Sequence, residues 1–369
     1  MNRYLKKYIE RDLQKKMVFV GGPRQVGKTT LAKSFLEDNQ GYLNWDISKD
    51  REKILKNEIP PAPILVFDEL HKYRLWRNYI KGVFDDLGQS RQILVTGSAR
   101  LDYYRRGGES LQGRYFYMRL HPLSVAELGI KTKADFSELL TLGGFPEPFF
   151  SSSKFDAKRW SLDYRERLLR DDLQGLEQVH DIGNLENLML RLPDLVSSPL
   201  SVNNLREDLQ VNHGTATRWL EILERLYAIF FLSPFGVPKL RAVKKERKHY
   251  HYDWTLIEDK GSRFENLLAC HLLKWTHFLR DTEGRNLELC YFRDVYKHEV
   301  DFVVVENKKP ILFVEAKWSD DEIAKGLQIL KQKFPQVPSW QVSFDGKKDY
   351  VSRDGIRVCN ALIFLQTLI

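Results

Sequence analysis

The chain has 369 residues, of which 43% are hydrophobic and 29% are charged. These fractions are those of an ordinary globular protein, and they exclude a disordered chain, a collagen-like chain and a small disulfide-stapled scaffold. The net charge of +8 is compatible with a polyanionic partner such as DNA but does not require one.

Membrane and redox features favour a cytoplasmic protein. The longest apolar run near the middle of the chain, Leu226–Leu232, is far shorter than the roughly 20 residues that cross a bilayer. Residues 1–12 are charged and lack the apolar core of a signal peptide. The three cysteines, Cys270, Cys290 and Cys359, have neither metal-binding spacing nor the number expected of a disulfide framework. We therefore expect no membrane partner and a reducing, cytoplasmic setting.

The first 130 residues predict an α/β domain. At about 150 residues per domain, the chain length favours two or three domains. In residues 17–129, short apolar runs alternate with helical patterns, which predicts a mostly parallel sheet for the domain of residues 1–130. The apolar runs are Met17–Val20, Tyr42–Trp45, Ile64–Phe67 and Ile93–Val95.

Three further segments are predicted downstream. Residues 131–198 are mainly helical and form a connector. Residues 199–252 combine two helices with a hairpin, and residues 253–369 begin with a helix and continue with strands. The last segment is therefore a second α/β domain. Its predicted strands are Glu288–Phe292, Glu299–Val305 and Ile311–Ala316.

A phosphate-binding loop follows the first apolar run. Residues 22–29, Gly-Pro-Arg-Gln-Val-Gly-Lys-Thr, fit the pattern G-x-x-x-x-G-K-[ST] in full, between a predicted strand and a predicted helix. The glycines let backbone N–H groups face phosphate oxygens. Lys28 would reach the β- and γ-phosphates of ATP, and the Thr29 hydroxyl would bind Mg²⁺. The alternative is a chance match, which the flanking strand and helix argue against. The predicted nucleotide-binding residues are Gly22, Pro23, Arg24, Gln25, Val26, Gly27, Lys28, Thr29, Thr30 and Asp68.

Two acids end the third apolar run. We expect Asp68 to hold Mg²⁺ together with Thr29, and Glu69 to orient the attacking water. The alternative is that both acids only cap the next helix. The fourth run ends in Thr96-Gly-Ser98, which would place Thr96 or Ser98 near the γ-phosphate. Arg114 is a candidate for charge stabilisation within the chain or across a subunit interface, as is Arg100, and a solvated surface charge is the alternative for each.

These motifs together resemble a known family. The chain is similar to the bacterial and archaeal AAA+-type ATPases that carry a C-terminal domain of unknown function, over roughly residues 1–320. The resemblance implies a P-loop ATPase core with ATP and Mg²⁺, a winged-helix-like middle segment and a nuclease-like C-terminal domain. The residues that carry it, besides the phosphate loop, are Phe67–Leu70, Thr96–Ser98, Leu120–Leu128 and Gly143–Glu147.

Residues 201–226 have helix–turn–helix character. Apolar residues recur at helical spacing on both sides of a turn at Asn212–Gly214, and a strand and a basic stretch follow. This pattern predicts a winged helix that binds DNA, with the second helix in the major groove. A protein-binding module is the alternative, and Glu221 and Glu224 on the second helix favour it. The bases assigned to the wing are Lys239, Arg241, Lys244, Lys245, Arg247 and Lys248.

The last domain carries acids on two neighbouring predicted strands. Asp301, and Glu315 with Lys317 two residues later, match the D…E-x-K signature of restriction-endonuclease-like nucleases, the PD-(D/E)xK class. In such a site Asp301, Glu315 and the helical Glu265 would bind a divalent metal, and Lys317 would orient the water that the metal activates. The alternative is an inactive fold whose residues form salt bridges with one another.

Two functions follow from these motifs. The first is a Mg²⁺-dependent ATPase of the AAA+ type, coupled to a DNA-binding and DNA-cleaving domain and assembled as a homo-oligomer if an arginine acts across subunits. The second is an ATP-dependent switch or interaction protein whose nuclease-like domain is an inactive scaffold. The filled set of Asp301, Glu315 and Lys317 favours chemistry over a scaffold.

Overall fold

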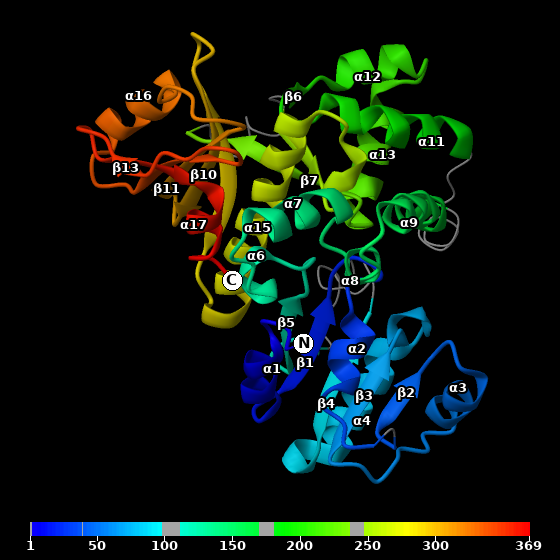
Figure 1. Ribbon diagram of the computed structural model, residues 1–369. Helices are drawn as coiled ribbons and strands as arrows, with labels where there is room; N and C mark the ends of the chain where they lie inside the picture. Colours follow the sequence, from blue (N-terminus) through cyan, green and yellow to red (C-terminus); the bar gives the residue numbers. More distant parts are fainter. Residues whose placement is uncertain (1, 39, 98–110, 170–180, 237–246) are drawn as a thin grey trace. The chain divides into compact units, whose positions relative to one another are not determined.

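A computed structural model of the chain describes residues 2–38, 40–97, 111–169, 181–236 and 247–369. The chain forms two compact units (Figure 1). The first unit comprises residues 1–122 with 225–227, and the second comprises residues 123–224 and 228–369. Among the described residues, no helix has the length and the apolar character needed to span a bilayer.

The first unit is built on a parallel sheet of five strands in the order β2-β3-β4-β1-β5. The predicted parallel α/β architecture is therefore confirmed for this part of the chain. The strands are β1 (Met17–Gly21), β2 (Tyr42–Asn44), β3 (Ile64–Asp68), β4 (Gln92–Thr96) and β5 (Tyr115–Arg119). The helices are α1 (Lys6–Leu13), α2 (Lys28–Lys33), α3 (Ser48–Leu55) and α4 (Trp76–Leu87), with 3₁₀ turns η1 (Leu70–Lys72) and η2 (Gly88–Ser90).

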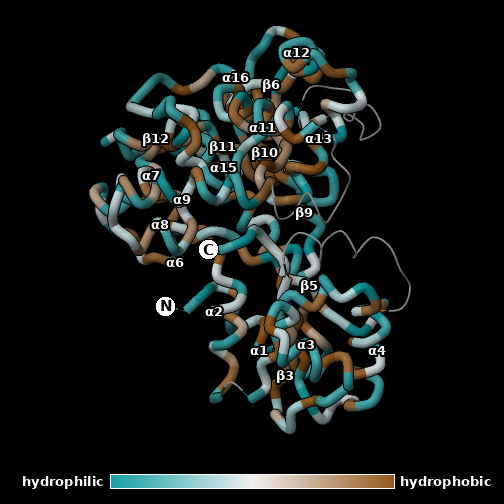
Figure 2. The backbone as a smooth tube through the Cα atoms, turned by 90° about the vertical axis from the view of Figure 1, so that its right-hand side faces the viewer, coloured by the Kyte–Doolittle hydropathy of each residue, from teal (hydrophilic) through white to brown (hydrophobic). Residues whose placement is uncertain are grey.

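The fifth strand was not among the predicted apolar runs. The strand β5 lies at the edge of the sheet, and it is only half-buried at Tyr115, Phe116 and Arg119, whereas Tyr117 and Met118 are buried. The central strands β1, β3 and β4 are almost fully buried. Figure 2 shows the hydrophobic segments of the chain in brown. Helix α4 adds Trp76, Ile80 and Val83 to this core.

The second unit is built on a mixed sheet of nine strands in the order β13-β14-β12-β11-β10-β9-β7-β8-β6. The strands are β6 (Pro199–Leu200), β7 (Ile229–Pro234), β8 (Arg247–His251), β9 (Leu287–Arg293), β10 (Glu299–Glu306), β11 (Lys309–Lys317), β12 (Ser339–Ser343), β13 (Tyr350–Val351) and β14 (Ile356–Asn360). The helices are α6 (Val125–Leu128), α7 (Lys133–Leu142), α8 (Pro146–Phe150), α9 (Lys154–Arg167), α11 (Ile182–Arg191), α12 (Val202–Asp208), α13 (His213–Arg225), α15 (Lys260–Glu283), α16 (Lys325–Lys333) and α17 (Ala361–Leu365), with 3₁₀ turns η5 (Leu192–Leu195) and η6 (Trp254–Leu256).

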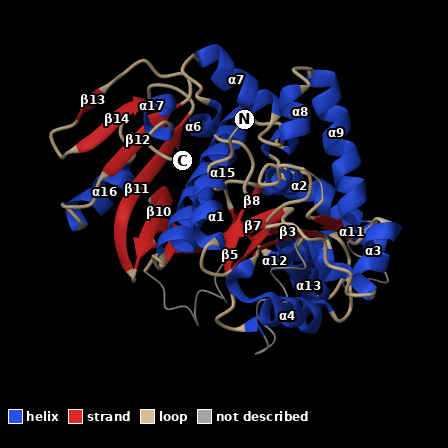
Figure 3. Cartoon of the chain, turned by 90° about the horizontal axis from the view of Figure 1, so that it is seen from below, coloured by secondary structure: helices blue, strands red, loops and turns tan. Residues whose placement is uncertain are grey.

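This sheet joins the segments that the sequence separates at residue 252. Strands β9, β10 and β11 are antiparallel neighbours, whereas β11, β12 and β14 run parallel. Figure 3 shows β10, β11, β12 and β14 side by side. The hairpin strand β7 pairs with β8 on one side and with β9 on the other. Helix α15 packs against β8, β9, β10 and β11. Apart from residues 225–227, the three predicted segments 131–198, 199–252 and 253–369 lie in the second unit, and the boundaries between them remain predictions.

Helices α12 and α13 occupy the segment predicted as a helix–turn–helix. Leu205 on α12 and Trp219, Leu220 and Leu223 on α13 are buried, as their helical spacing predicts. Arg218 is exposed on the opposite face of α13. Four of the six bases assigned to the wing, residues 239, 241, 244 and 245, lie outside the described residues.

Candidate functional site

The loop after β1 is held in a conformation that suits glycine. Gly22 has φ 131° and Gly27 has φ 95°, both in the left-handed region that other residues rarely adopt. A Cβ at Gly22 would lie 2.2 Å from the carbonyl oxygen of Leu120, so no side chain fits there. Gln25 also has a positive φ, of 57°. Successive turns of this kind point backbone N–H groups into one concavity, which is the geometry of an anion-binding loop.

Lys28 is the first residue of α2 and lies inside this loop. Its side-chain amine donates hydrogen bonds to the carbonyl oxygens of Gly22, at 3.0 Å, and of Pro23, at 2.6 Å. The residue is 8% exposed. Arg3 fastens the same loop to the segment after β5, because its guanidinium donates to Val26 O at 2.6 Å and to His121 O. Sequence reasoning missed Arg3, because it lies more than a hundred residues from His121.

Asp68 is the centre of a hydrogen-bond network at the carboxyl end of the sheet. Its Oδ2 accepts from the hydroxyls of Thr29 and Tyr42, each at 2.7 Å, and its Oδ1 accepts from the hydroxyl of Thr96. The parallel register explains this meeting, because Asp68 pairs with Thr96 on β4 and with Asn44 on β2. Burial and the Asp68 carboxylate raise the pKa of Tyr42, so Tyr42 stays a donor. Sequence reasoning did not include Tyr42.

Glu69 follows Asp68 directly and has φ 56°. Its backbone N–H donates to Thr96 O at 3.0 Å, which holds it at the same edge of the sheet. Its carboxylate lies 3.1 Å from the amine of Lys72 and 3.7 Å from Nε2 of His71. The structure therefore brings Glu69 next to Asp68, with its charge neutralised by Lys72.

Arg114 lies at the amino ends of the parallel strands, opposite the phosphate loop. It precedes β5, which runs parallel to β1, so it lies at the amino end of the strands whereas Lys28 follows their carboxyl end. Its guanidinium forms a bidentate pair with Asp85, at 2.9 and 3.3 Å. From this position Arg114 does not stabilise charge at the phosphate loop of its own chain, which contradicts that prediction. Its role across a subunit interface remains a prediction. Ser98 and Arg100 lie outside the described residues.

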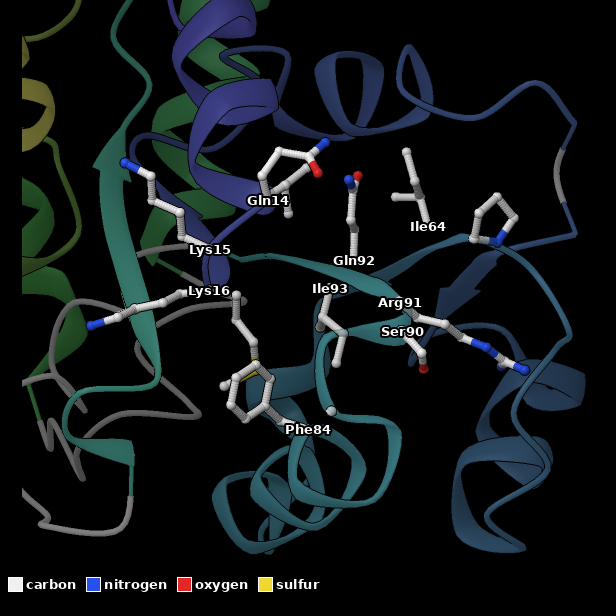
Figure 4. A pocket seen from close by; sticks show the side chains of 13 residues that line it. Gln14, Lys15, Lys16, Ile64, Phe84, Ser90, Arg91, Gln92 and Ile93 are labelled. Carbon is white, nitrogen blue, oxygen red and sulfur yellow. The ribbon is translucent and has the colours of Figure 1, made fainter.

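A cavity of about 360 Å³ opens at the amino ends of the strands (Figure 4). It is lined by the end of α1 and by the beginnings of β1, β3 and β4, with Lys15, Arg91 and Gln92 among its side chains. Because the strands are parallel, this cavity lies at the end of the sheet opposite the phosphate loop. It therefore does not belong to the site around Lys28 and Asp68.

The carboxyl-end site fits a nucleotide with Mg²⁺. Its loop is a cradle that a Cβ at Gly22 would fill, its cation is the Lys28 amine, and its hard oxygen ligands are the Thr29 hydroxyl and the Asp68 carboxylate. These are the donor types that bind phosphate and magnesium. Mg²⁺, when bound there, would neutralise charge on the phosphate oxygens.

The second unit brings together the four residues of the predicted metal site. The backbone N–H of Asp301 donates to Glu315 Oε2 at 3.3 Å, and the backbone N–H of Ala316 donates to Asp301 Oδ2 at 3.0 Å. The amine of Lys317 donates to Glu315 Oε1 at 2.9 Å. Glu265 reaches the same place from α15, where its Oε1 accepts from the hydroxyl of Tyr250 at 2.7 Å.

A second lysine lies among these acids. Lys248 was assigned above to an exposed basic wing, but it is 0% exposed on β8. Its amine lies 3.4 Å from Glu265 Oε1 and 3.4 Å from Asp301 Oδ1, and it also pairs with Glu299. The assignment to the wing is therefore wrong. The strand Arg247–His251 reads Arg-Lys-His-Tyr-His and does not alternate apolar with polar residues, so its pattern did not show which side chains face the interior.

The protonation of the cluster follows from burial and charge. Burial raises the pKa of Glu265 to about 7, and the negative charge of Asp301 acts in the same direction. Burial raises the pKa of Glu315 to about 8 for the same two reasons. Burial by itself lowers the pKa of Lys248, but Tyr250 and the carboxylates outweigh it and the pKa rises well above its usual range. Lys248 is thus a fixed positive charge.

The arrangement around Lys248 does not fit a divalent metal. The carboxylate oxygens of Glu265 and Asp301 that could converge on a metal instead face an ammonium group. Across the part of the chain that the structure describes, no group of three or more acidic, histidine or cysteine side chains is arranged to hold a metal ion. No chemical step is therefore derived from a metal in this unit.

Three family models match the chain in succession. Residues 14–129 match the model of the AAA domain. The N-terminal part of the chain is an AAA-type P-loop domain. Residues 133–259 and 260–364 match two domains of unknown function, DUF8612 and DUF4143. The AAA match covers the phosphate loop, Asp68 and all five strands of the first sheet, which supports nucleotide binding by this part of the chain.

The similarity to known proteins extends beyond the AAA domain. Uncharacterized proteins of Mycobacterium bovis and Mycobacterium tuberculosis are each 25% identical over 329 residues, which cover 85% of this chain and 73% of theirs. The Orc1 protein of Aeropyrum pernix, solved in complex with DNA, is a structural neighbour with 11% identity and a TM-score of 0.35, covering 73% of this chain and 93% of that one. A STAND ATPase of Pyrococcus horikoshii with a tetratricopeptide-repeat sensor has 15% identity and a TM-score of 0.24. The match covers 76% of this chain and 47% of that protein.

Proposed function

We propose that the chain hydrolyses ATP with Mg²⁺ in its AAA domain and that the nucleotide state switches a DNA-binding second unit that does not cleave DNA. The observation that carries the ATPase part is the network of Asp68, whose carboxylate links Thr29 of the phosphate loop to Thr96 of the neighbouring strand. A carboxylate in this place connects the nucleotide to the two central strands, so a change at the phosphates reaches the sheet.

The proposed roles follow from the contacts. Lys28 would exchange the carbonyl oxygens of Gly22 and Pro23 for phosphate oxygens, a charged partner that binds an ammonium group more strongly. Thr29 and Asp68 would hold Mg²⁺. Glu69 would leave Lys72 and accept a hydrogen bond from the attacking water, whose proton it would then take.

For the second unit, we propose a nuclease-like arrangement that serves as a scaffold. The placement of Asp301 and Glu315 on adjacent antiparallel strands, with Lys317 and Glu265 beside them, supports the nuclease-like assignment. The insertion of Lys248 among the acids supports the inactive alternative over DNA cleavage. We propose a winged helix for α12, α13 and the β7–β8 hairpin, with α13 as the DNA contact.

The ATPase proposal is tested with three variants of the full chain. Lys28→Ala should abolish ATP binding in calorimetry, because the loop loses its cation. Glu69→Gln should retain ATP binding but lower the hydrolysis rate by roughly 10²–10⁴-fold, because only water activation is removed. Lys53→Ala, at an exposed lysine on α3, is the matched control and should behave as wild type. ATP binding that survives in Lys28→Ala would refute the assignment of this loop.

The DNA proposal is tested by fluorescence anisotropy with a labelled duplex over a series of salt concentrations. Arg218→Ala on α13 should weaken binding and reduce the log–log salt slope by about one unit if this guanidinium contacts a phosphate. Arg280→Ala, at an exposed position on α15, is the control. Wild type with Mg²⁺ or Mn²⁺ should leave supercoiled plasmid intact. Nicking that disappears in Asp301→Ala would contradict the scaffold assignment.

A further inference from the structure

The buried acid cluster of the second unit contains a cation supplied by the chain itself. We propose that the Lys248 ammonium permanently occupies the position of a divalent metal among Glu265, Glu299 and Asp301, so that this domain is complete without a metal ion. This inference rests on the proposed nuclease-like assignment of the C-terminal segment, and it does not depend on the AAA domain.

The contacts of Lys248 are those of a bound cation. Its amine lies at 3.4 Å from oxygens of Glu265 and Asp301 and pairs with Glu299, so three carboxylates from α15 and β10 surround one positive charge. The ring of Tyr291 lies 5.6 Å from the same amine and adds a cation–π contact. The lysine side chain has no exposed surface, so the charge is shielded from water.

The backbone holds Lys248 in this place. Strand β8 pairs with β7 on one side, where Lys248 is opposite Leu232, and with β6 on the other, where it is opposite Pro199. Withdrawal of the strand would break both ladders. A divalent ion entering beside the ammonium would meet a like charge at a few ångströms, where electrostatic repulsion opposes binding. The carboxylates of Glu265, Glu299 and Asp301 therefore stay paired with Lys248.

The remaining acid is neutralised in the same way. Glu315 receives the Lys317 amine at 2.9 Å and the Asp301 backbone N–H at 3.3 Å, so both of its oxygens have protein donors. The other oxygen of Asp301 accepts from Ala316. Each carboxylate that the D…E-x-K pattern would offer to a metal already has a partner within the chain.

The test is Mn²⁺ binding to the full chain without nucleotide, followed by electron paramagnetic resonance and by thermal unfolding. Wild type and Asp301→Asn should bind Mn²⁺ equally, because the ion has no place in the cluster. Lys248→Met removes the ammonium and keeps the apolar stem. It should unfold at a lower temperature in EDTA, bind Mn²⁺ at least roughly a hundredfold more tightly than wild type, and regain stability with Mn²⁺. Adding Asp301→Asn to Lys248→Met should abolish that gain.

Two results would overturn the inference. One is Mn²⁺ binding to wild type that is lost in Asp301→Asn, since a metal would then displace Lys248. The other is a folded Lys248→Met that binds no additional Mn²⁺. If Lys248→Met does not fold, the comparison of wild type with Asp301→Asn decides by itself. ATP binding measured on the same variants should equal wild type, so a failure at the AAA domain is distinguishable from a failure here.

Discussion

His271 on α15 provides a quantitative test of how the second unit is held together. The ring is buried, its Nδ1 lies 2.8 Å from Leu267 O, and its Nε2 lies 3.1 Å from the backbone N of Val125. A carbonyl accepts and a backbone N–H donates, so the ring is neutral, with its proton on Nδ1. A second proton on Nε2 would face the Val125 N–H without a partner. Burial accordingly lowers the pKa of His271 from 6.5 to about 4.

The sign and size of the effect follow from linkage between protonation and folding. Between pH 6.5 and pH 4 the unfolded chain binds a proton at His271 that the folded chain does not, so the free energy of unfolding falls as the pH falls. With pKa values of about 6.5 unfolded and about 4 folded, this residue alone removes about 2 kcal/mol between pH 7 and pH 5, and about 3 kcal/mol by pH 4.

The perturbation is His271→Gln, whose side-chain amide can donate to Leu267 O and accept from Val125 but does not titrate. Urea unfolding followed by circular dichroism at pH 7 and pH 5 gives the loss of stability for each protein. The loss should be about 2 kcal/mol smaller in the variant than in wild type. His213→Gln, at an exposed position on α13, controls for the chemical change. Equal losses in wild type and His271→Gln, or an NMR titration of the His271 ring near pH 6.5, would refute the reasoning.

Two further substitutions test particular contacts. Gly22→Ala would place a methyl group 2.2 Å from Leu120 O at a φ of 131°, and displacing the loop at about 1–3 kcal/mol should weaken ATP binding at least tenfold in calorimetry; affinity equal to wild type would show that the loop adapts freely. Glu127→Gln leaves the ammonium of Lys274, whose side chain is 2% exposed, without its carboxylate, so urea unfolding should show a loss of about 3–5 kcal/mol. Adding Lys274→Met should recover much of that loss, and no recovery would indicate that packing rather than charge is responsible.

The sequence predicts the parts of the protein whose defining residues are adjacent along the chain. The phosphate loop is recognisable because its glycines, Lys28 and Thr29 lie within eight positions, and an anion-binding loop needs them in that order. The central strands β1, β3 and β4 are recognisable because burial on both faces requires an unbroken apolar run. Asp68 follows from the same logic, since it ends such a run.

Other features depend on which distant segments meet. The edge strand β5 has a mixed pattern, and its position beside β1 removes Arg114 from the phosphate loop. The pairing of β7 with β9 merges two segments that composition and turns separate. Arg3 joins the loop only because the chain returns to it at His121.

The residue order was enough to predict a P-loop in an α/β unit and a pattern of acids and a lysine with nuclease-like spacing near the C-terminus. The partners of those acids became visible in the folded chain, where they face Lys248. Lys248 is 53 residues from Asp301 along the chain, and its neighbours resemble those of a solvated basic segment. Whether an amine faces water or carboxylates depends on the sheet that buries it, because the electrostatic energy of a charge is set by its surroundings in space and not by its neighbours in sequence.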